Sequence, residues 1–252
     1  MMVAEVRTNQ RLIKAEPCTL IWSEPLPGGG RAVVKMYRRR GYFDPIRRLF
    51  VPYRVEREFH MLAKLHQSRV PCPEPLRWSQ GWSARHGRFE MLATREIPAT
   101  MPLKERLLRA PNAVSDLAPL FRLARQMHDC GVSHGAFYPA NILVRMPSAG
   151  APRFHVIDFA HGCGFARGIA GTRPADFDLL DMLRAIERVA PLDDCALWLD
   201  GYGTGAAHFR KLIAMLMTHR IDRPWRHLHR AETDTRAAWD RLSRPAASRA
   251  SA

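Results

Sequence analysis

The chain has 252 residues, of which 46% are hydrophobic and 25% charged, a composition that suits a globular protein with one two-lobed domain or two small ones. No stretch approaches the roughly 18 consecutive apolar residues of a membrane-spanning helix, and the opening MMVAEVRTNQRLIK lacks the apolar segment of a signal peptide, so we expect a cytoplasmic protein. The formal net charge of +15 favours anionic partners, but no nucleic-acid-binding motif accompanies it, so nucleic acid is the least favoured of them.

The first hundred residues or so are expected to contain strands and one helix. The apolar, β-branched stretches CTLIWSE and RAVVKMY predict two strands. We interpret PLPGGG between them as a hairpin turn, which needs residues that tolerate positive φ, and not as a phosphate-binding loop. If a nucleotide loop exists, it is the upstream turn RLIKAEP, which lacks glycine. Helical spacing of Phe59, Leu62 and Leu65 predicts a helix ending near His66, and RFEMLATREI predicts a strand that leads into a linker.

The remainder is expected to be mainly helical. ATMPLKERL and AVSDLAPLFRLARQMHDCG predict helices, the second with Ser115 or Asp116 as N-cap and Gly131 as its stop. NILVRM and FHVIDFA predict two short strands, and a long helical region starts near Asp176. The sequence therefore predicts an α+β fold in two lobes, with a β-rich lobe over residues 1–97, a helical lobe over 98–243 and a disordered tail over 244–252.

Four side chains occur in the order that phosphoryl transfer from ATP requires. Such a site needs a Lys at the phosphates, a Glu that holds the Lys, and an Asn and an Asp for metal ions. Lys35 ends the apolar strand AVVK, and Glu58 lies beside the apolar stripe of the predicted helix, with Glu56 as the less well placed alternative. HGAFYPAN supplies Asn141, and VIDFA supplies Asp158, so these two are the predicted Mg²⁺ ligands.

Two further stretches complete this pattern. ATREI, the end of the predicted strand RFEMLATREI, would offer backbone groups to the adenine of a nucleotide, and its candidate residues are Thr94, Glu96 and Ile97. His134 opens the motif HGAFYPAN, in the manner of a catalytic loop. Each signal is weak alone, but the order and the spacing of all of them together predict a kinase-like fold.

The chain resembles the bacterial lipopolysaccharide kinase family, the Kdo and core-heptose kinases, within the protein-kinase-like superfamily. VVKMYRRRG, EFHMLAKLHQSRVPCPEPL, MHDCGVSHGAFYPANILV, HVIDFAHG and ADFDLLDMLRAI carry the resemblance over about residues 10 to 190. It implies ATP with Mg²⁺ and phosphorylation of sugar hydroxyls of the lipopolysaccharide inner core at the cytoplasmic face of the inner membrane. By position, Lys35 would contact phosphates, Glu58 would pair with it, Asn141 and Asp158 would hold metal, and Asp178 would support the catalytic loop.

The chain departs from the family pattern at Ala136, because active family members carry Asp at this position of the catalytic loop. InaA-like branches of the family also have a residue other than Asp there. Loss of a general base typically costs about 10²–10⁴-fold in rate, but a loose transition state needs little deprotonation of the acceptor. His134, His161 and Asp176 are candidate substitutes, each with a structural role as the alternative. Two functions remain open: a weak or unconventional phosphotransferase, and a nucleotide-binding pseudokinase with a regulatory or scaffold role.

Two basic segments suggest further contacts. KMYRRRGYFDPIRRLF interleaves arginines with aromatic residues, so it fits an anionic membrane surface or a phosphorylated sugar, with a solvated loop as the alternative. HRIDRPWRHLHRAETDTRAAWDRL, with Trp225 and Trp239, predicts a helical cap or, alternatively, a membrane-surface helix. A peripheral location at the inner membrane follows as an expectation, whereas nothing in the sequence indicates an oligomeric state.

Overall fold

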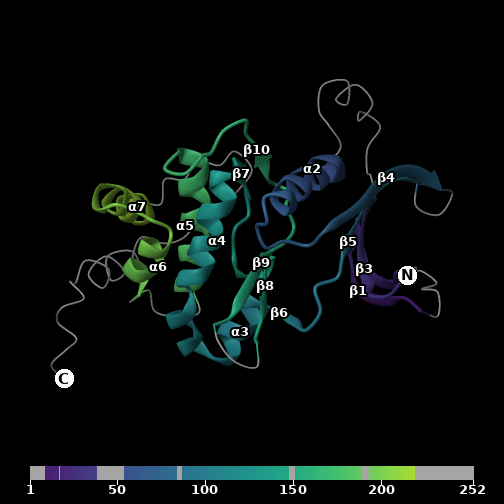
Figure 1. Ribbon diagram of the computed structural model, residues 1–252, viewed down its shortest axis with the longest axis horizontal. Helices are drawn as coiled ribbons and strands as arrows, with labels where there is room; N and C mark the ends of the chain where they lie inside the picture. The colour runs from purple at the N-terminus through teal and green to yellow at the C-terminus, as the bar shows by residue number, and fades with distance from the viewer. Residues whose placement is uncertain are drawn as a thin grey trace. The chain divides into compact units, whose positions relative to one another are not determined.

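The computed structural model describes residues 9–16, 18–38, 54–83, 87–147, 151–188, 192 and 194–218 (Figure 1). The chain divides into two compact units. The first comprises Met1–Ala99 with Val156–Cys163, and the second comprises Thr100–His155 with Gly164–Ala252. The short segment that carries Asp158 thus belongs to the first unit, although it follows residue 97, where the sequence placed the boundary between the lobes.

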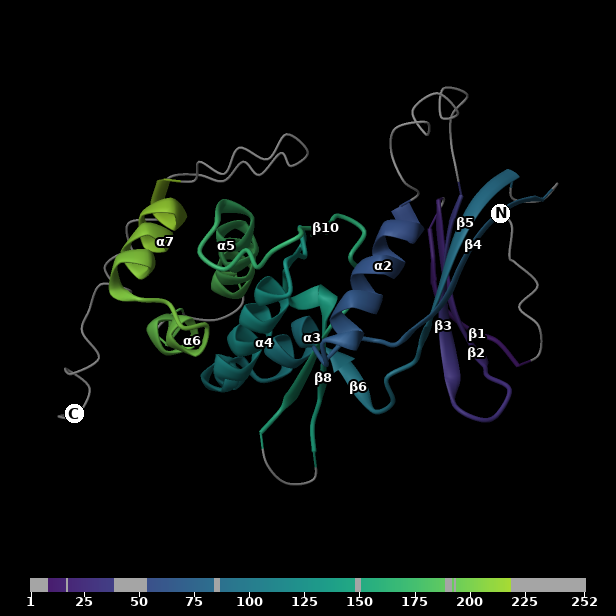
Figure 2. The same ribbon diagram turned by 45° about the horizontal axis from the view of Figure 1, so that its top comes forward.

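The first unit is built on a five-stranded antiparallel sheet and one helix. The strand order is β1-β2-β3-β5-β4, with β1 at Arg11–Ala15, β2 at Thr19–Pro25, β3 at Arg31–Arg38, β5 at Gly87–Arg95 and β4 at Pro75–Ser83. Helix α2 (Arg54–Gln67) contacts β4 and β5 and lies along one face of the sheet (Figure 2).

Alternation along β3 separates its side chains into two faces. Ala32, Val34 and Met36 are buried and lie on one face, and Lys35 points to the other because successive residues of a strand alternate. Leu92 is the partner of Lys35 across the ladder to β5, so the two share the face on which Lys35 lies. One strand therefore supplies an apolar face and, on the opposite face, the Lys35 ammonium.

The turn chemistry of PLPGGG was predicted correctly, and that of RLIKAEP was not. Residues 26–30 close a hairpin in which the Leu26 amide donates to the Gly30 carbonyl at 3.0 Å. Gly28, Gly29 and Gly30 all have positive φ. RLIKAEP, predicted as a turn, instead contains strand β1, whose five residues are all exposed. An exposed edge strand has no apolar alternation, so the sequence carried little signal for it.

The second unit contains two small sheets and a set of helices. β6 (Thr100–Pro102), β8 (Ile142–Arg145) and β9 (Arg153–Val156) form a three-stranded sheet, and β7 (Val132–Ser133) pairs with β10 (Cys163–Gly164). The helices are α3 (Leu103–Arg109), α4 (Ala118–Asp129), α5 (Arg173–Glu187), α6 (Cys195–Gly201) and α7 (Ala206–Thr218), with short 3₁₀ turns η1 (Pro111–Asp116) and η2 (Pro139–Asn141).

Two predicted helix starts in this unit were wrong. ATMPLKERL begins as strand β6 and turns helical only after Pro102, whose ring allows it to begin a helix but not to sit inside one. Neither Ser115 nor Asp116 caps α4, because both lie in η1, and Leu117 occupies the cap position without a side-chain hydrogen bond. Pro119 in the first turn favours this start.

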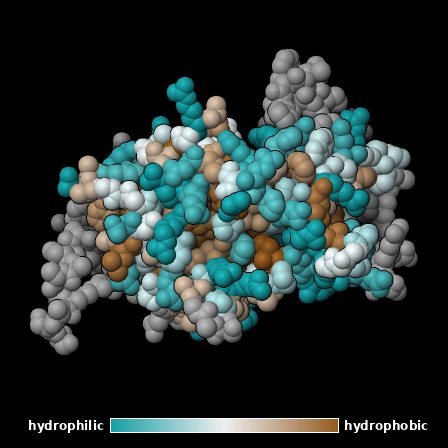
Figure 3. All heavy atoms as spheres, viewed as in Figure 1, coloured by the Kyte–Doolittle hydropathy of each residue, from teal (hydrophilic) through white to brown (hydrophobic). Residues whose placement is uncertain are grey.

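Hydrophilic residues predominate on the face of the molecule shown in Figure 3, and hydrophobic residues are interspersed among them. Among the described residues, none of the helices is both long enough and apolar enough to cross a membrane. Most of the basic segment after Lys35 (residues 39–50), the segment with Trp225 and Trp239, and the tail 244–252 lie outside the described residues.

Candidate active site

Lys35, Glu58 and Asp158 meet in the first unit, although they are far apart in the sequence. Lys35 Nζ lies 2.5 Å from Asp158 Oδ1 and 3.4 Å from Glu58 Oε1. β3 presents Lys35, and α2 presents Glu58 on its buried face with Leu62 and Leu65. Glu58 is 2% exposed, and the alternative Glu56 is only half-buried, so the structure places Glu58 at the lysine.

Burial and charge act in opposite directions on this cluster. Burial raises the pKa of Glu58 above its ordinary value, although the Lys35 ammonium opposes this shift. Burial alone would lower the pKa of Lys35, but the charges of Glu58 and Asp158 together with Tyr37 raise it well above its ordinary value. Lys35 therefore remains a cation across the physiological pH range. The same burial raises the pKa of the neighbouring Tyr37 to about 12.

Asp158 has an unusual backbone conformation, with φ of +64°. A non-glycine residue in the left-handed region is uncommon and costs free energy, so such residues gather at functional sites. The next amide, that of Phe159, donates to Glu58 Oε1 at 3.2 Å, and the Phe159 side chain is buried. Glu58 thus holds both the lysine and the backbone that follows Asp158.

In the second unit, the Asp178 carboxylate organises the loop that contains His134 and Ala136. Asp178 Oδ2 accepts from the amide of His134 at 2.7 Å and from Ser133 Oγ at 2.9 Å, and Oδ1 accepts from the amide of Gly135 at 2.8 Å. His128 Nε2 lies 3.2 Å from Oδ2. All of these groups are buried, so the loop backbone is fixed by a satisfied carboxylate.

These hydrogen bonds decide the ionisation of Asp178. Burial by itself would raise the pKa of this carboxyl group, but the hydrogen bonds and the nearby imidazoles of His128 and His134 outweigh burial and lower the pKa. Asp178 accepts hydrogen bonds from the loop amides and from Ser133, so it holds the loop, as the family resemblance implied.

The loop also fixes the amide of Asn141. Asn141 Nδ2 donates to the carbonyl of Ala136 at 3.0 Å, which leaves the amide oxygen on the other side of the group. Ala136 is 1% exposed and His134 is fully buried, with its ring against Phe137 at 5.8 Å between centroids. His134 therefore packs inside the loop, which is the structural role that the sequence left as its alternative.

The two other candidates for the base, Asp176 and His161, do not belong to the loop of His134 and Ala136. Asp176 is fully buried, and its carboxylate binds His208 at 2.6 Å and Lys211 at 2.5 Å, both on α7. Asp176 and Asp178 are two positions apart on α5, about 200° around the helix, so they face different neighbours. His161 is exposed and belongs to the first unit.

Glu96, which directly follows β5, contacts residues of β1, β2 and β3 that lie far from it in the sequence. The Glu96 carboxylate accepts from Ser23 and from Arg11, the latter at 2.8 Å, and lies 3.5 Å from Arg31 Nε. The Glu96 amide donates to the Arg31 carbonyl at 2.8 Å, and Thr94 pairs with Val33 in the sheet. Thr94 and Ile97 are half-buried, and the adenine contact assigned to Thr94, Glu96 and Ile97 stays a prediction.

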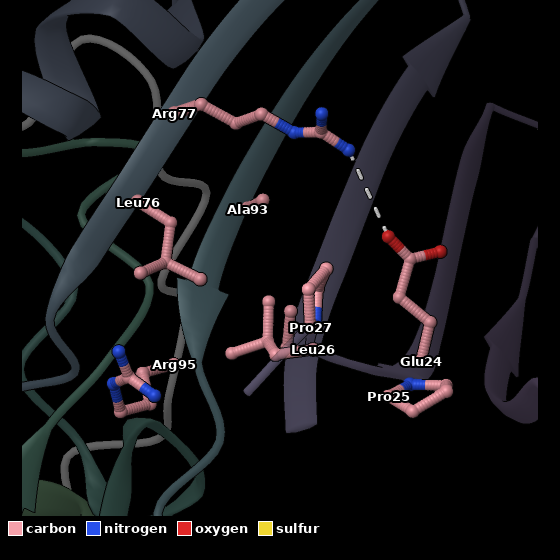
Figure 4. Close-up of a pocket in the computed structure, with 9 residues that line it drawn as sticks. Glu24, Pro25, Leu26, Pro27, Leu76, Arg77, Ala93 and Arg95 are labelled. Carbon is pink, nitrogen blue, oxygen red and sulfur yellow. Dashed lines mark ion pairs between the residues drawn. The ribbon is translucent and has the colours of Figure 1, made fainter. Parts of the chain in front are cut away.

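A cavity of about 370 Å³ in the first unit lies away from Lys35. Ala32, Leu26, Leu76 and Ala93 contribute to its lining, and Ala32 faces the side of the sheet opposite to Lys35. Figure 4 shows Arg77 reaching toward Glu24 across this face, with 3.8 Å between the charged atoms. The cavity is therefore not the place where Lys35 would meet a phosphate.

Sequence reasoning missed three residues that the structure joins to the Asp178 network: His128, Ser133 and Tyr202. Ser133 and His128 lie close to the loop in the sequence, and the pattern MHDCGVSHG contains both. Tyr202 is 74 residues from His128, yet its Oη lies 2.8 Å from His128 Nδ1. No local spacing signals such a contact, because it depends on how α6 packs on α4.

Comparisons with known proteins agree with this geometry. Residues 30–202 match the model of the lipopolysaccharide kinase (Kdo/WaaP) family. The solved structure of WaaP in complex with acyl carrier protein is 17% identical, has a TM-score of 0.57, and the match covers 92% of this chain and 86% of that one, which shows a protein-kinase-like fold. The Rio2 kinase from Chaetomium thermophilum is 21% identical with a TM-score of 0.49, covering 88% of this chain and 74% of that one. No curated protein matches the chain.

Proposed function

Because the chain belongs to the lipopolysaccharide kinase (Kdo/WaaP) family, whose members are kinase-like phosphotransferases, we propose that it transfers a phosphoryl group from Mg²⁺-bound ATP to a sugar hydroxyl. The acceptor is the lipopolysaccharide core or a related envelope molecule. The observation that carries the proposal is the cluster of Lys35, Glu58 and Asp158, in which Glu58 and Lys35 are largely buried and the Asp158 side chain is 37% exposed. Charged groups whose pKa values are strongly perturbed in this way gather at functional sites.

Lys35 is the phosphate-binding cation in this proposal. Its ammonium keeps its charge because Glu58 and Asp158 surround it, and a preorganised cation stabilises the charge that spreads over a transferred phosphoryl group. Glu58 positions the lysine and, at 2% exposure, has almost no surface with which to contact a ligand. Removal of either charge is expected to weaken phosphoryl transfer.

The oxygen donors present fit Mg²⁺, which prefers carboxylate and carbonyl oxygens and keeps part of its shell for water and phosphate. The Asp158 side chain is 37% exposed. The hydrogen bond from Asn141 Nδ2 to the Ala136 carbonyl leaves the Asn141 amide oxygen to act as a metal ligand. Among the described residues, three or more His, Cys, Asp or Glu side chains never gather at a common metal position. We propose Asp158 and Asn141 as the ligands from their positions in the motifs VIDFA and HGAFYPAN, and bound Mg²⁺ would neutralise phosphate charge.

In this proposal the acceptor oxygen bonds to the γ-phosphorus as the bond from that phosphorus to the ADP oxygen breaks, and the hydroxyl proton passes late to solvent water, without a carboxylate at residue 136. His134 is buried in its loop, and Asp176 is bound by His208 and Lys211, so neither is placed as a replacement base. A loose transition state tolerates this arrangement, because little negative charge on the nucleophile is needed before the phosphoryl group leaves. The expected enzyme is slow and depends on the positioning of the nucleotide.

Incubation with γ-labelled ATP and envelope extract tests the proposal. We expect label in the lipopolysaccharide fraction with the wild-type protein, and at least about 10²-fold less with Asp158→Asn, because this substitution removes a ligand charge. Asp116→Asn is the matched control, since Asp116 pairs with Arg106 at a half-exposed position of η1. Equal labelling by all three proteins would refute the role of Asp158.

Ala136 favours a second candidate, a nucleotide-binding pseudokinase with a regulatory or scaffold role. Its carbonyl completes the Asn141 contact, so the loop is intact without a base. Calorimetric titration with Mg²⁺ and ATP separates the candidates: binding without transfer to any envelope fraction supports the pseudokinase, and no binding at millimolar ATP excludes both.

We further propose a cytoplasmic protein that is peripheral to the inner membrane, which sedimentation with anionic liposomes tests.

A further inference from the structure

We infer that Tyr202 is a positioning residue that couples the segment ending at Gly171 to the loop of His134 and Gly135, through the side chains of His128 and Asp178. The inference concerns only the second unit, to which all six residues belong. It does not depend on which nucleotide or acceptor the protein binds.

A continuous line of buried hydrogen bonds connects these residues. Tyr202 Oη lies 2.8 Å from His128 Nδ1, and His128 Nε2 lies 3.2 Å from Asp178 Oδ2. Asp178 then accepts from the amides of His134 at 2.7 Å and Gly135 at 2.8 Å. His128 and Asp178 are fully buried, and Tyr202 is 2% exposed, so water does not compete for these groups.

The chemistry of the two ends decides where the protons lie. An ionised carboxylate only accepts hydrogen bonds, so His128 Nε2 carries a proton toward Asp178. In a neutral imidazole, Nδ1 is then an acceptor, and the Tyr202 hydroxyl donates to it. A hydrogen bond from the backbone of Gly171 opposes the rise that burial causes in the pKa of the Tyr202 hydroxyl. With a neutral imidazole the network therefore has one consistent arrangement, which the Asp178 carboxylate sets and the Tyr202 hydroxyl completes.

The segment before Gly171 is docked on the end of α4, close to His128. The Ile169 amide donates to the His128 carbonyl at 2.8 Å, and the Phe165 amide donates to the Gly131 carbonyl at 2.7 Å. A Cβ at Gly131 would lie 2.4 Å from the Arg167 carbonyl oxygen, so only glycine permits this approach. The backbone contacts and the Tyr202 hydroxyl thus tie the same segment to the same histidine.

The hydroxyl and the ring of Tyr202 have separable contacts. The ring lies edge-on to the His128 ring at 5.6 Å and beneath Arg125 at 5.8 Å, and Arg125 Nη1 also donates to the Tyr202 carbonyl at 3.4 Å. Tyr202→Phe keeps all of these contacts and removes only the hydroxyl. A purely structural role for Tyr202 predicts that this substitution changes little in the distant loop.

The experiment combines nitrogen NMR of the histidine rings with amide hydrogen exchange, on the full chain without ligand. At pH 8 the wild type should show His128 as the neutral tautomer with a proton on Nε2. Tyr202→Phe removes the hydrogen bond to Nδ1, so it should shift the Nδ1 resonance and should raise the exchange of the His134 and Gly135 amides at least about tenfold relative to amides in the middle of α4.

Phe121→Leu is the matched control, because Phe121 stacks on Trp198 at the same α4–α6 interface but has no part in the hydrogen-bond line. It should lower the stability and leave the exchange ratio between the loop and α4 unchanged. The inference is overturned if wild-type His128 is protonated on Nδ1, if Tyr202→Phe leaves both readouts unchanged, or if Phe121→Leu changes the ratio equally. Failure to bind ATP would affect none of these measurements, so it would count against the proposed function alone.

Discussion

Two buried carboxylates, Glu58 in the first unit and Asp178 in the second, are held in opposite ways. Glu58 Oε1 accepts from Lys35 and from the Phe159 amide, whereas Oε2 is buried with no hydrogen-bond partner among the described residues. Asp178 accepts at both oxygens from backbone and side-chain donors. Accordingly, the pKa of Glu58 is raised by burial, whereas that of Asp178 is lowered because hydrogen bonds outweigh burial.

The difference separates a cluster suited to chemistry from one suited to holding geometry. An incompletely satisfied buried carboxylate next to a lysine costs free energy, and the cost is lowest when a further charged ligand joins the cluster. A fully satisfied carboxylate resists rearrangement and keeps its neighbours in place. The cluster in the first unit therefore presents a charge, and the Asp178 network in the second unit holds a loop backbone in place.

Asp178→Ala should have the largest effect. It leaves the donors of His128, Ser133, His134 and Gly135 buried without an acceptor, and each such loss costs about 1–3 kcal/mol. Since these losses are not additive, we expect destabilisation of at least about 4 kcal/mol, or failure to fold. Urea denaturation measures it, with Asp116→Ala as the surface control. A loss below about 1 kcal/mol would show that the loop is held by other contacts.

Lys35→Met should be next in size and should affect activity before stability. It removes the cation of the first cluster, so we expect phosphoryl transfer to fall by about 10²–10³-fold, the scale of a lost transition-state charge contact. Lys14→Met, at a half-exposed surface pair with Glu16, is the control. Labelled ATP and envelope extract provide the assay. Unchanged transfer by Lys35→Met would remove the first cluster from the proposed mechanism.

Ala136→Asp tests whether the second unit lacks only a base. A carboxylate here should raise the transfer rate by about 10²-fold, the lower end of general-base effects. Because residue 136 is 1% exposed, the added charge should also cost about 1–3 kcal/mol of stability. Rate and thermal stability are measured on the same preparation. A stability loss without a rate gain would indicate that the loop has been rebuilt around alanine.

Glu58→Gln should give the smallest effect, visible in the pH dependence of stability. A carboxyl group whose pKa is raised on folding contributes stability that is present below its unfolded pKa of about 4.3 and is lost as pH rises through its folded pKa. The wild type should therefore lose about 2–4 °C of Tm relative to Glu58→Gln between pH 4 and 7.

The contribution of Asp178 has the opposite sign. Its lowered pKa gives stability that is present above the unfolded value of about 3.9 and is lost as pH falls through the lower folded pKa. Tm measurements from pH 3 to 8 on the wild type and Glu58→Gln separate the two carboxylates. A Tm difference between these proteins that does not change between pH 4 and 7 would contradict the raised pKa of Glu58.

Motifs with tight spacing were the most informative part of the sequence. The fold class and the kinase-like family followed from Lys35, Glu58, Asn141 and Asp158 in order, and the family and the WaaP likeness confirm both. The pairing of Lys35 with Glu58 was expected from the same order, and the 3.4 Å between their charged atoms agrees with it, whereas the contact between Lys35 and Asp158 was not predicted. The roles of these residues in binding ATP and metal stay predictions.

Weakly patterned segments were the least informative. The edge strand β1 has no buried residue, and β4 contains Pro75 and Gly81, which both disfavour a strand, so neither gave a clear signal. The start of α4 depends on Pro119 and η1 and not on a capping side chain. Local propensity is decisive only where no tertiary contact outweighs it.

The sequence by itself determined which chemical groups this protein has, namely a strand-borne lysine, a helix-borne glutamate and an alanine at residue 136 of the motif HGAFYPAN. Only the tertiary structure decided that Glu58 is buried, that His134 packs inside its loop and that Tyr202 reaches His128 across 74 residues. The reason is physical. Short-range patterns record strand and helix periodicity, whereas burial and hydrogen-bond partners depend on which distant segments pack together.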